Sequence, residues 1–122
     1  MKVEEAATIL NDSGGWNMSN IGVWENAEPG VKRKIFEPGE TIMMMEVHFE
    51  ANAEGYVHSH PHEQLSYCIK GKLEFTIDGE KRVIGQGETI YIPSGAKHGA
   101  LALEPSILLD TFTPVREDLV KR

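Results

Sequence analysis

The stretch HSHPHEQ at residues 58–64 packs three histidines, a glutamate and a glutamine around one proline. Only two other histidines occur in the whole chain. On a β-strand, residues two positions apart point to the same face, so His58 and His60 can direct their imidazoles to one spot. Pro61 favours a bend in the chain. After that bend, Gln64 opens the next predicted strand and can face the same spot.

A fourth histidine, His98, opens another predicted strand directly after PSGAK at residues 93–97. Three neutral imidazoles and one amide oxygen suit one divalent metal ion such as Ni, Zn, Fe or Mn. With four protein ligands, an octahedral ion keeps two positions open for water or substrate, which favours catalysis. Histidines on a solvated surface remain the alternative reading of these residues, because a single His-x-His pair is weak evidence.

Composition narrows the classes of partner and the cellular compartment. The 122 residues suit one domain, and a net charge of −7 argues against nucleic acid or an anionic membrane as partner. No apolar run is long enough to span a bilayer, and the acidic start MKVEEAATIL does not resemble an export signal. Cys68 is the single cysteine, so we expect no internal disulfide, a buried thiol and a cytoplasmic location.

From residue 31 onward, short alternating segments are separated by glycine and proline. Residues 41–49 alternate in hydrophobicity, and so do residues 72–78. Asp78-Gly79 predicts a tight hairpin turn, because both central residues of that turn favour positive φ. Many short strands with regular turns predict an all-β sandwich or small barrel. Only the tail after Pro114, VREDLVKR, looks helical.

The chain divides into a mixed N-terminal extension, residues 1–24, and a main domain, residues 25–122. The extension carries both tryptophans, Trp16 and Trp24. Exposed tryptophans are unusual on an ordered monomer, so we expect this segment to pack on the main domain or on a second subunit.

Two segments resemble the motifs of the cupin family. HSHPHEQLSYCIKG, residues 58–71, is similar to the first motif, and GETIYIPSGAKH, residues 87–98, is similar to the second. The resemblance implies a double-stranded β-helix, or jelly-roll barrel, whose metal ligands are His58, His60, Gln64 and His98. Two positions depart from the family pattern: Asn52 stands where the first motif begins with glycine, and Ala102 where the second ends with asparagine.

A second candidate site lies in LLDTFTPVR, residues 108–116. From the residues alone, Asp110 is either a surface acid or a buried acid with a raised pKa beside the metal. The D-x-F-x-P-x-R-x-D pattern, together with HSHPHEQ, resembles small KdgF-type cupins of pectin and alginate breakdown. That family converts 4,5-unsaturated monouronates to linear keto-uronates. The resemblance implies that Asp110 moves a proton, Phe112 packs on the sugar ring and Arg116 binds the sugar carboxylate.

The leading hypothesis is a metal-dependent, lyase- or isomerase-type enzyme that opens the ring of an unsaturated monouronate. The expected substrate is a small anionic sugar acid, and we expect a homodimer. Two other functions are compatible with the same ligands. An iron-dependent dioxygenase would consume oxygen, whereas a non-catalytic sugar-binding module would bind without turnover.

Overall fold

The computed structural model describes residues 8–10 and 16–122, and all the regular structure in these residues is β-strand. Because none of it is helical, no helix in the described ranges can cross a membrane. Twelve strands follow one another along the chain: β1 (Thr8–Leu10), β2 (Trp16–Met18), β3 (Trp24–Glu28), β4 (Val31–Ile35), β5 (Met43–Phe49), β6 (Glu54–His58), β7 (Glu63–Lys70), β8 (Lys72–Ile77), β9 (Glu80–Gly85), β10 (Thr89–Ile92), β11 (His98–Ala102) and β12 (Ser106–Thr113).

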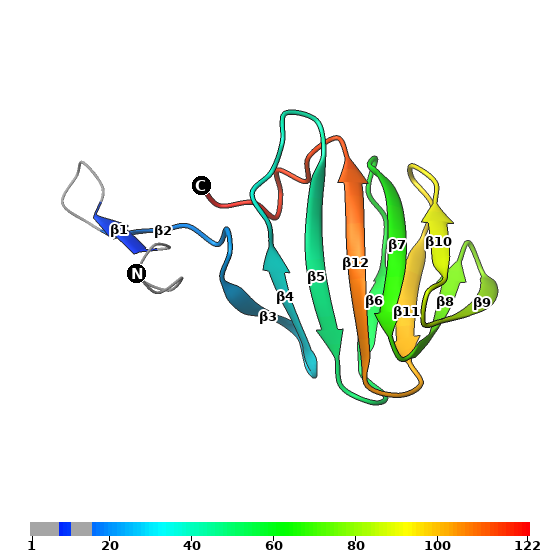
Figure 1. Cartoon of the computed structure of the whole chain (residues 1–122). Helices are drawn as coiled ribbons and strands as arrows, with labels where there is room; N and C mark the ends of the chain where they lie inside the picture. The colour runs from blue at the N-terminus through cyan, green and yellow to red at the C-terminus, as the bar shows by residue number, and fades with distance from the viewer. Residues whose placement is uncertain (1–7, 11–15) are drawn as a thin grey trace.

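Two antiparallel sheets form the main body, as the sequence predicted for a jelly-roll barrel (Figure 1). The larger sheet has six strands in the order β10-β7-β12-β5-β4-β3, and the smaller has four in the order β6-β11-β8-β9. β3, β4 and β5 pair in chain order, as do β8 and β9. The other neighbours, such as β12 with β5 and β7, are far apart in sequence, so long-range pairing joins these parts of the core. β1 and β2 pair only with each other and are drawn to one side of the barrel in Figure 1.

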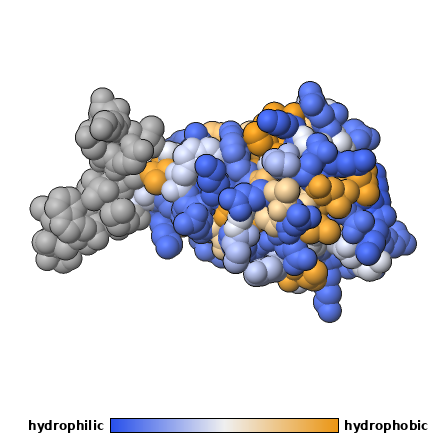
Figure 2. All heavy atoms as spheres, turned by 90° about the horizontal axis from the view of Figure 1, so that it is seen from below, coloured by the Kyte–Doolittle hydropathy of each residue, from blue (hydrophilic) through white to orange (hydrophobic). Residues whose placement is uncertain are grey.

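Strict alternation along the strands builds the inner faces of the two sheets. In β5, Met43, Met45, Val47 and Phe49 are all buried, and the residues between them are at least partly exposed. The same pattern in β7 buries Gln64, Ser66 and Cys68. Because side chains alternate between faces, this register points polar groups of β7 into the barrel together with its apolar ones. The outside is mostly hydrophilic with scattered apolar patches in the view of Figure 2.

The predicted hairpin turn between β8 and β9 is confirmed. Asp78 and Gly79 have φ values of 47° and 84°, the left-handed conformation that this turn requires at both positions. Asn52, which replaces the first glycine of the family motif, has φ of 68°. Asparagine tolerates this conformation better than most residues, so the departure from the pattern keeps the local backbone shape.

The predicted helical tail is wrong: residues 117–119 form a single turn, and the rest of 115–122 is irregular. The Arg116 carbonyl accepts hydrogen bonds from the backbone N–H groups of Leu119 and Val120, and no further turn follows. Instead, Asn20 binds the tail, since its side chain donates to the Leu119 carbonyl and accepts from the Lys121 N–H. An eight-residue segment gains little as an isolated helix, so these tertiary bonds prevail.

The N-terminal extension joins the main body near its own end. Ile21 forms an isolated bridge with Ile35 of β4, and β3 begins at Trp24. Residues 1–7 and 11–15 of this extension, and the side chain of Trp16, lie outside the part of the chain that the structure describes. Packing of this part on the barrel or on a second subunit therefore stays a prediction.

Candidate metal centre and acid–base site

Three of the predicted metal ligands form a compact cluster at one end of the smaller sheet. His58 ends β6, His98 opens β11, and these two residues are direct cross-strand partners. His60 follows in the loop after β6. One ring nitrogen from each of the three histidines lies within 4.8 Å of the others. The structure thus brings together side chains that are 40 residues apart in sequence, from His58 to His98.

Backbone carbonyls fix the tautomer of each imidazole. Nδ1 of His58 lies 2.8 Å from the Tyr56 carbonyl and Nδ1 of His98 lies 2.9 Å from the Ala96 carbonyl. Nδ1 of His60 lies 3.0 Å from the carbonyl of the residue two positions ahead. A carbonyl only accepts, so each Nδ1 carries the proton and each Nε2 keeps a lone pair. This is the arrangement of metal-binding histidines, whose second nitrogen is held by an outer hydrogen bond.

Two features of the cluster fit a cation between these nitrogens. Nε2 of His98 is buried and has no hydrogen-bond partner among the described residues. Nε2 of His60 lies 3.1 Å from Oε1 of Gln64. Since Nε2 of His60 and the amide oxygen are both acceptors in this tautomer, the contact is unfavourable unless a positive charge lies beside both atoms. The four residues therefore offer three nitrogens and one oxygen to a divalent metal ion.

A chain of hydrogen bonds connects this cluster to Asp110. The amide nitrogen of Gln64 donates to Oγ of Ser66 at 3.0 Å, and the Ser66 hydroxyl donates to Oδ1 of Asp110 at 2.6 Å. The first bond also sets the amide orientation that turns Oε1 toward His60. A glutamate at position 64 could not donate to Ser66 and would place a second carboxylate near Asp110.

Burial is the largest influence on the pKa values of the site. It lowers the pKa of His98 to about 4, and it lowers the pKa of His60 below its ordinary value. Both imidazoles are therefore neutral, as metal ligands must be, at any pH near neutrality. Burial also raises the pKa of Asp110 to about 6, although the Ser66 hydrogen bond and the positive charge of Arg116 oppose the rise.

Asp110, Phe112 and Leu108 share the inner face of β12. The exposed fractions of these side chains are 6%, 1% and 2%. The Phe112 ring lies edge-on to the His60 ring, with 5.6 Å between their centroids. Asp110 is therefore the buried acid of the two readings, placed among apolar side chains on the same face as the histidine cluster.

Arg116 is buried although it lies in the irregular tail. Its guanidinium is stacked 5.2 Å from the Phe112 ring centroid. Nε and Nη2 donate to the two carboxylate oxygens of Asp118 at 3.1 Å and 2.8 Å. One edge of the guanidinium is thus occupied by Asp118, and Nη1 has no partner among the described residues. Arg116 places positive charge beside Asp110, and its Nη1 amino group is still open.

The barrel interior leaves a narrow cavity of about 80 Å³ beside His58, His98, Gln64 and Asp110. It continues into a wider mouth of about 290 Å³, which Arg33, Tyr56 and Leu119 line together with Asp110 and Arg116. Because the two spaces share Asp110, Arg116 and His58, they form one path from solvent to the histidine cluster. The combined space suits one monosaccharide rather than a polymer.

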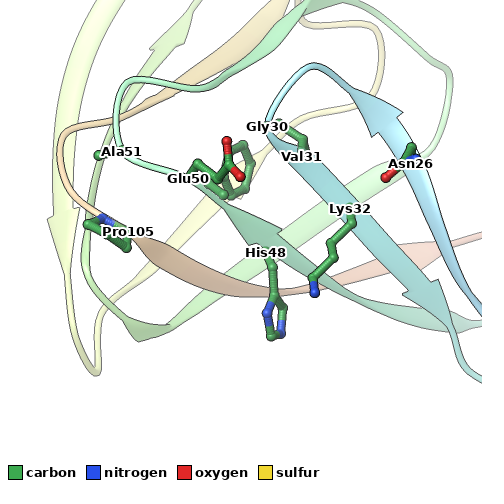
Figure 3. A pocket seen from close by; sticks show the side chains of 9 residues that line it. Asn26, Gly30, Val31, Lys32, His48, Glu50, Ala51 and Pro105 are labelled. Carbon is green, nitrogen blue, oxygen red and sulfur yellow. The ribbon is translucent and has the colours of Figure 1, made fainter.

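A larger hollow, about 460 Å³, lies on the outer surface and includes none of the predicted site residues. Figure 3 shows Lys32 and His48 on neighbouring strands with their side chains pointing the same way, and Glu50 and Gly30 near the adjoining loop. His48 also contacts Glu46 at 2.5 Å. The chemistry-bearing groups converge inside the barrel, so size alone does not identify the functional cavity.

Sequence reasoning missed Ser66 and Arg33 as parts of this site. Ser66 is two residues after Gln64 on the same strand, so alternation alone places both side chains inside the barrel. Arg33 lies between the buried residues Val31 and Ile35 of β4, which is the matching signal.

Comparison with known proteins agrees with the fold and the motifs. The family model for the cupin domain matches residues 45–112, which is more than half of the chain. This match runs from β5 to β12 and includes all four predicted metal ligands. The chain therefore belongs to the cupin family.

Within that family the chain is similar to proteins named KdgF. It is 39% identical over 99 residues to the pectin degradation protein KdgF of Dickeya dadantii, covering 80% of this chain and 90% of that protein. The structure of KdgF from Halomonas sp. superposes with a TM-score of 0.76 at 38% identity, covering 80% of this chain and 90% of the other. An RmlC-like cupin from Shewanella frigidimarina gives a TM-score of 0.76 at 37% identity, covering 80% and 87%.

Proposed function

We propose that this protein is a metal-dependent enzyme that opens the ring of a 4,5-unsaturated monouronate to give the linear keto-uronate. One observation carries the proposal: a buried carboxylate, Asp110, is hydrogen-bonded through Ser66 to Gln64, beside three histidines whose ring nitrogens converge. The similarity to a protein named for pectin degradation supports a sugar acid as the substrate.

In this proposal His58, His60, Gln64 and His98 hold one divalent metal, and Ni, Zn, Fe and Mn all suit the donor set. Such an ion would hold and polarise the hydroxyl and ring oxygens of the sugar. Gln64 is a neutral ligand, so it leaves more positive charge on the ion than glutamate would. Its amide N–H group also ties the ligand set to Ser66 and Asp110.

The reaction is an isomerisation, and Asp110 is the proposed proton carrier. The anomeric hydroxyl loses a proton as the bond between the anomeric carbon and the ring oxygen breaks, and an aldehyde forms. The ring oxygen keeps the electron pair of the broken bond, so an enolate is released. This enolate takes one proton at C4, the double bond is lost and a ketone forms at C5, so one proton is lost and one is gained overall. A carboxyl group with a pKa of about 6 can accept and return a proton close to neutral pH.

Phe112 and Arg116 complete the proposed catalytic group. Phe112 forms part of the apolar wall against which the sugar ring packs. Arg116 stabilises negative charge on Asp110 and on the substrate, using its open Nη1, while Asp118 holds its other edge. This local cation offsets the repulsion that a chain of net charge −7 exerts on an anionic substrate.

The test uses unsaturated monouronates released by a pectate lyase and by an alginate lyase. Metal-loaded protein should accelerate the loss of the double-bond absorbance, and His98→Ala or a chelator should abolish the acceleration. Asp110→Asn should bind metal normally yet lose at least a hundredfold in rate, in the range of a lost general acid–base group. Equal rates with and without protein, for every divalent metal tried, would refute the proposal. Oxygen consumption during the assay would instead identify a dioxygenase.

We also propose that two copies of the chain associate through the outer face of the larger sheet. Exposed apolar side chains gather there on β5, β7 and β10: Met44, Leu65, Tyr67, Ile69 and Tyr91. Tyr91, Leu65, Thr111 and Met44 stand side by side across four neighbouring strands. Three of these four residues are large and apolar. An exposed apolar patch of this kind is unusual on a monomer, and a self-complementary patch suits a two-fold dimer.

A further inference from the structure

Arg33 is the second cation at the mouth of the barrel, and nothing in the motifs pointed to it. Its neighbours on the same face of β4, Val31 and Ile35, are 5% and 0% exposed, so Arg33 also points inward. It lines the mouth of the cavity together with Asp110 and Arg116. An arginine on the inner face of a barrel is costly to desolvate. Its position there therefore points to ligand binding more strongly than an arginine on the outer surface would.

The guanidinium of Arg33 is held by one atom and is open at the others. Nε donates to Oε1 of Glu25, its cross-strand partner, at 2.9 Å. Glu25 is held in turn by the Asn20 amide, whose Nδ2 lies 3.2 Å from the same oxygen. Neither Nη1 nor Nη2 of Arg33 has a hydrogen-bond partner among the described residues. The two outer N–H groups therefore remain available as a pair that matches the geometry of a carboxylate.

The register of the larger sheet places Arg33 at the distance of one sugar from the reacting groups. Arg33 pairs with Val47, whereas Asp110 pairs with Met45, and β5 lies between their strands. With strands about 4.8 Å apart and residues about 3.4 Å along each strand, the two backbones are offset by about 10 Å across and about 7 Å along the sheet. A long arginine side chain and a single six-membered ring together fill this gap.

The two arginines of the mouth differ in what they offer. Arg116 has its Nε–Nη2 edge bound to Asp118, so a substrate carboxylate cannot use that edge without displacing Asp118. Arg33 lines the same space from β4 and offers an unoccupied pair of N–H groups. This inference rests on the proposed function: we infer that Arg33 binds the carboxylate of the monouronate and thereby selects sugar acids over neutral sugars. Arg116 then mainly stabilises the negative charge of Asp110.

Four variants test this assignment. Arg33→Gln removes the charge and the fork, and Arg33→Lys keeps the charge without the paired N–H groups. Lys32→Gln is the matched control, because it makes the same change of charge one residue away on the outer face of β4. Glu25→Gln weakens the internal competitor for Arg33.

In the turnover assay, Arg33→Gln should raise KM for the unsaturated monouronate about tenfold or more with a smaller change in kcat, the size expected for a lost charged hydrogen-bonded pair. Arg33→Lys should fall between Arg33→Gln and the unchanged protein. Lys32→Gln should leave KM within about twofold, and Glu25→Gln should lower KM. An unchanged KM in both Arg33 variants would overturn the inference while leaving the proposed reaction intact.

A binding measurement separates the inference from the reaction. Chemical-shift titration of the labelled protein with D-galacturonate and with D-galactose compares a monoanionic sugar with its neutral counterpart. Arg33→Gln should weaken galacturonate binding about tenfold and leave galactose unaffected. This result without any turnover of unsaturated uronates would support Arg33 and refute the reaction. Equal weakening for both sugars would show a structural effect and would overturn the inference. The inference would also be overturned if the wild-type protein neither binds galacturonate nor turns over monouronates.

Discussion

Asp110 illustrates how a single residue acquires its chemistry from its surroundings. Its carboxyl group lies on a fully paired strand among apolar side chains, so ionisation is unfavourable there and the pKa rises to about 6. Ser66 supplies one hydrogen bond to the carboxylate and Arg116 supplies a positive charge, which together limit the rise. The same aspartate on the outer face would titrate as an ordinary surface acid, with no value as a proton carrier near neutral pH.

This shift predicts a pH-dependent stability of the metal-free protein. The folded pKa of Asp110, about 6, is above its ordinary value of 3.8, so the folded state holds the proton more tightly than the unfolded state. The associated stabilisation is fully present below pH 3.8 and is lost as pH rises through about 6. The full loss is about 3 kcal/mol by linkage.

Urea unfolding of chelator-treated protein at several pH values measures the effect. The free energy of unfolding of Asp110→Asn minus that of the wild type should increase between pH 4 and pH 7, because the amide does not ionise. Subtracting the two curves removes the titration of all other groups. A difference that is flat over this range would show that Asp110 is not perturbed by burial in solution.

At the scale of the elements, positive-φ residues decide where the strands end and how closely they approach. Gly71 separates β7 from β8 with φ of 94°, and a Cβ placed there would lie 2.2 Å from Oγ of Ser106 and 2.5 Å from the Pro105 carbonyl oxygen. Gly79, in the hairpin turn, has φ of 84° but has no atom within 4 Å of such a Cβ. The first glycine is therefore required for space as well as conformation, and the second for conformation alone.

Alanine substitutions at these two glycines should separate the two effects. Gly79→Ala should cost about 1–2 kcal/mol, the strain of a left-handed backbone with a Cβ. Gly71→Ala should cost more, about 3 kcal/mol or above, because Pro105 and Ser106 must also move away from the added Cβ. Urea unfolding midpoints for both variants test this order. Equal losses would mean that the contact with Ser106 relaxes freely.

The whole molecule has two chemically different faces on its larger sheet. The inner face carries Gln64, Ser66, Asp110 and the core, whereas the outer face of the same strands carries Leu65, Tyr67 and the other exposed apolar residues. Alternation along β7 thus contributes residues to both the proposed acid–base site and the proposed dimer surface. Because the two faces lie on opposite sides of the sheet, the proposed association on the outer face leaves open the mouth that Arg33 and Arg116 line.

Leu65→Arg should convert the proposed dimer to a monomer, since a charge in the centre of the apolar row is costly to bury. Val83→Arg is the matched control, because Val83 is 47% exposed on β9 of the smaller sheet and Leu65 is 49% exposed. Light scattering after size exclusion gives the mass of each variant. If the dimer persists in Leu65→Arg, the interface lies elsewhere, and deletion of residues 1–18 becomes the next variant to test.

The sequence by itself determined the class of the fold and the positions of its turns. Period-two alternation predicts strands from local sequence alone. The dipeptide Asp78-Gly79 likewise predicts a tight hairpin turn, which the structure has. The two motifs indicated the cupin family, because their glycines and histidines stand at fixed spacings. The same local reasoning failed for the tail after Pro114, whose backbone partners come from Asn20, far away in the chain.

Only the tertiary structure decided which polar residues face one another. The bond from Ser66 to Asp110 joins β7 to β12, and a pair 44 positions apart leaves no local signal. The occupied edge of Arg116 and the open N–H groups of Arg33 also depend on neighbours that the fold supplies. Local patterns fix conformation through steric and hydrophobic forces of short range, whereas burial, pKa and hydrogen-bond partners depend on chain segments that only folding brings together.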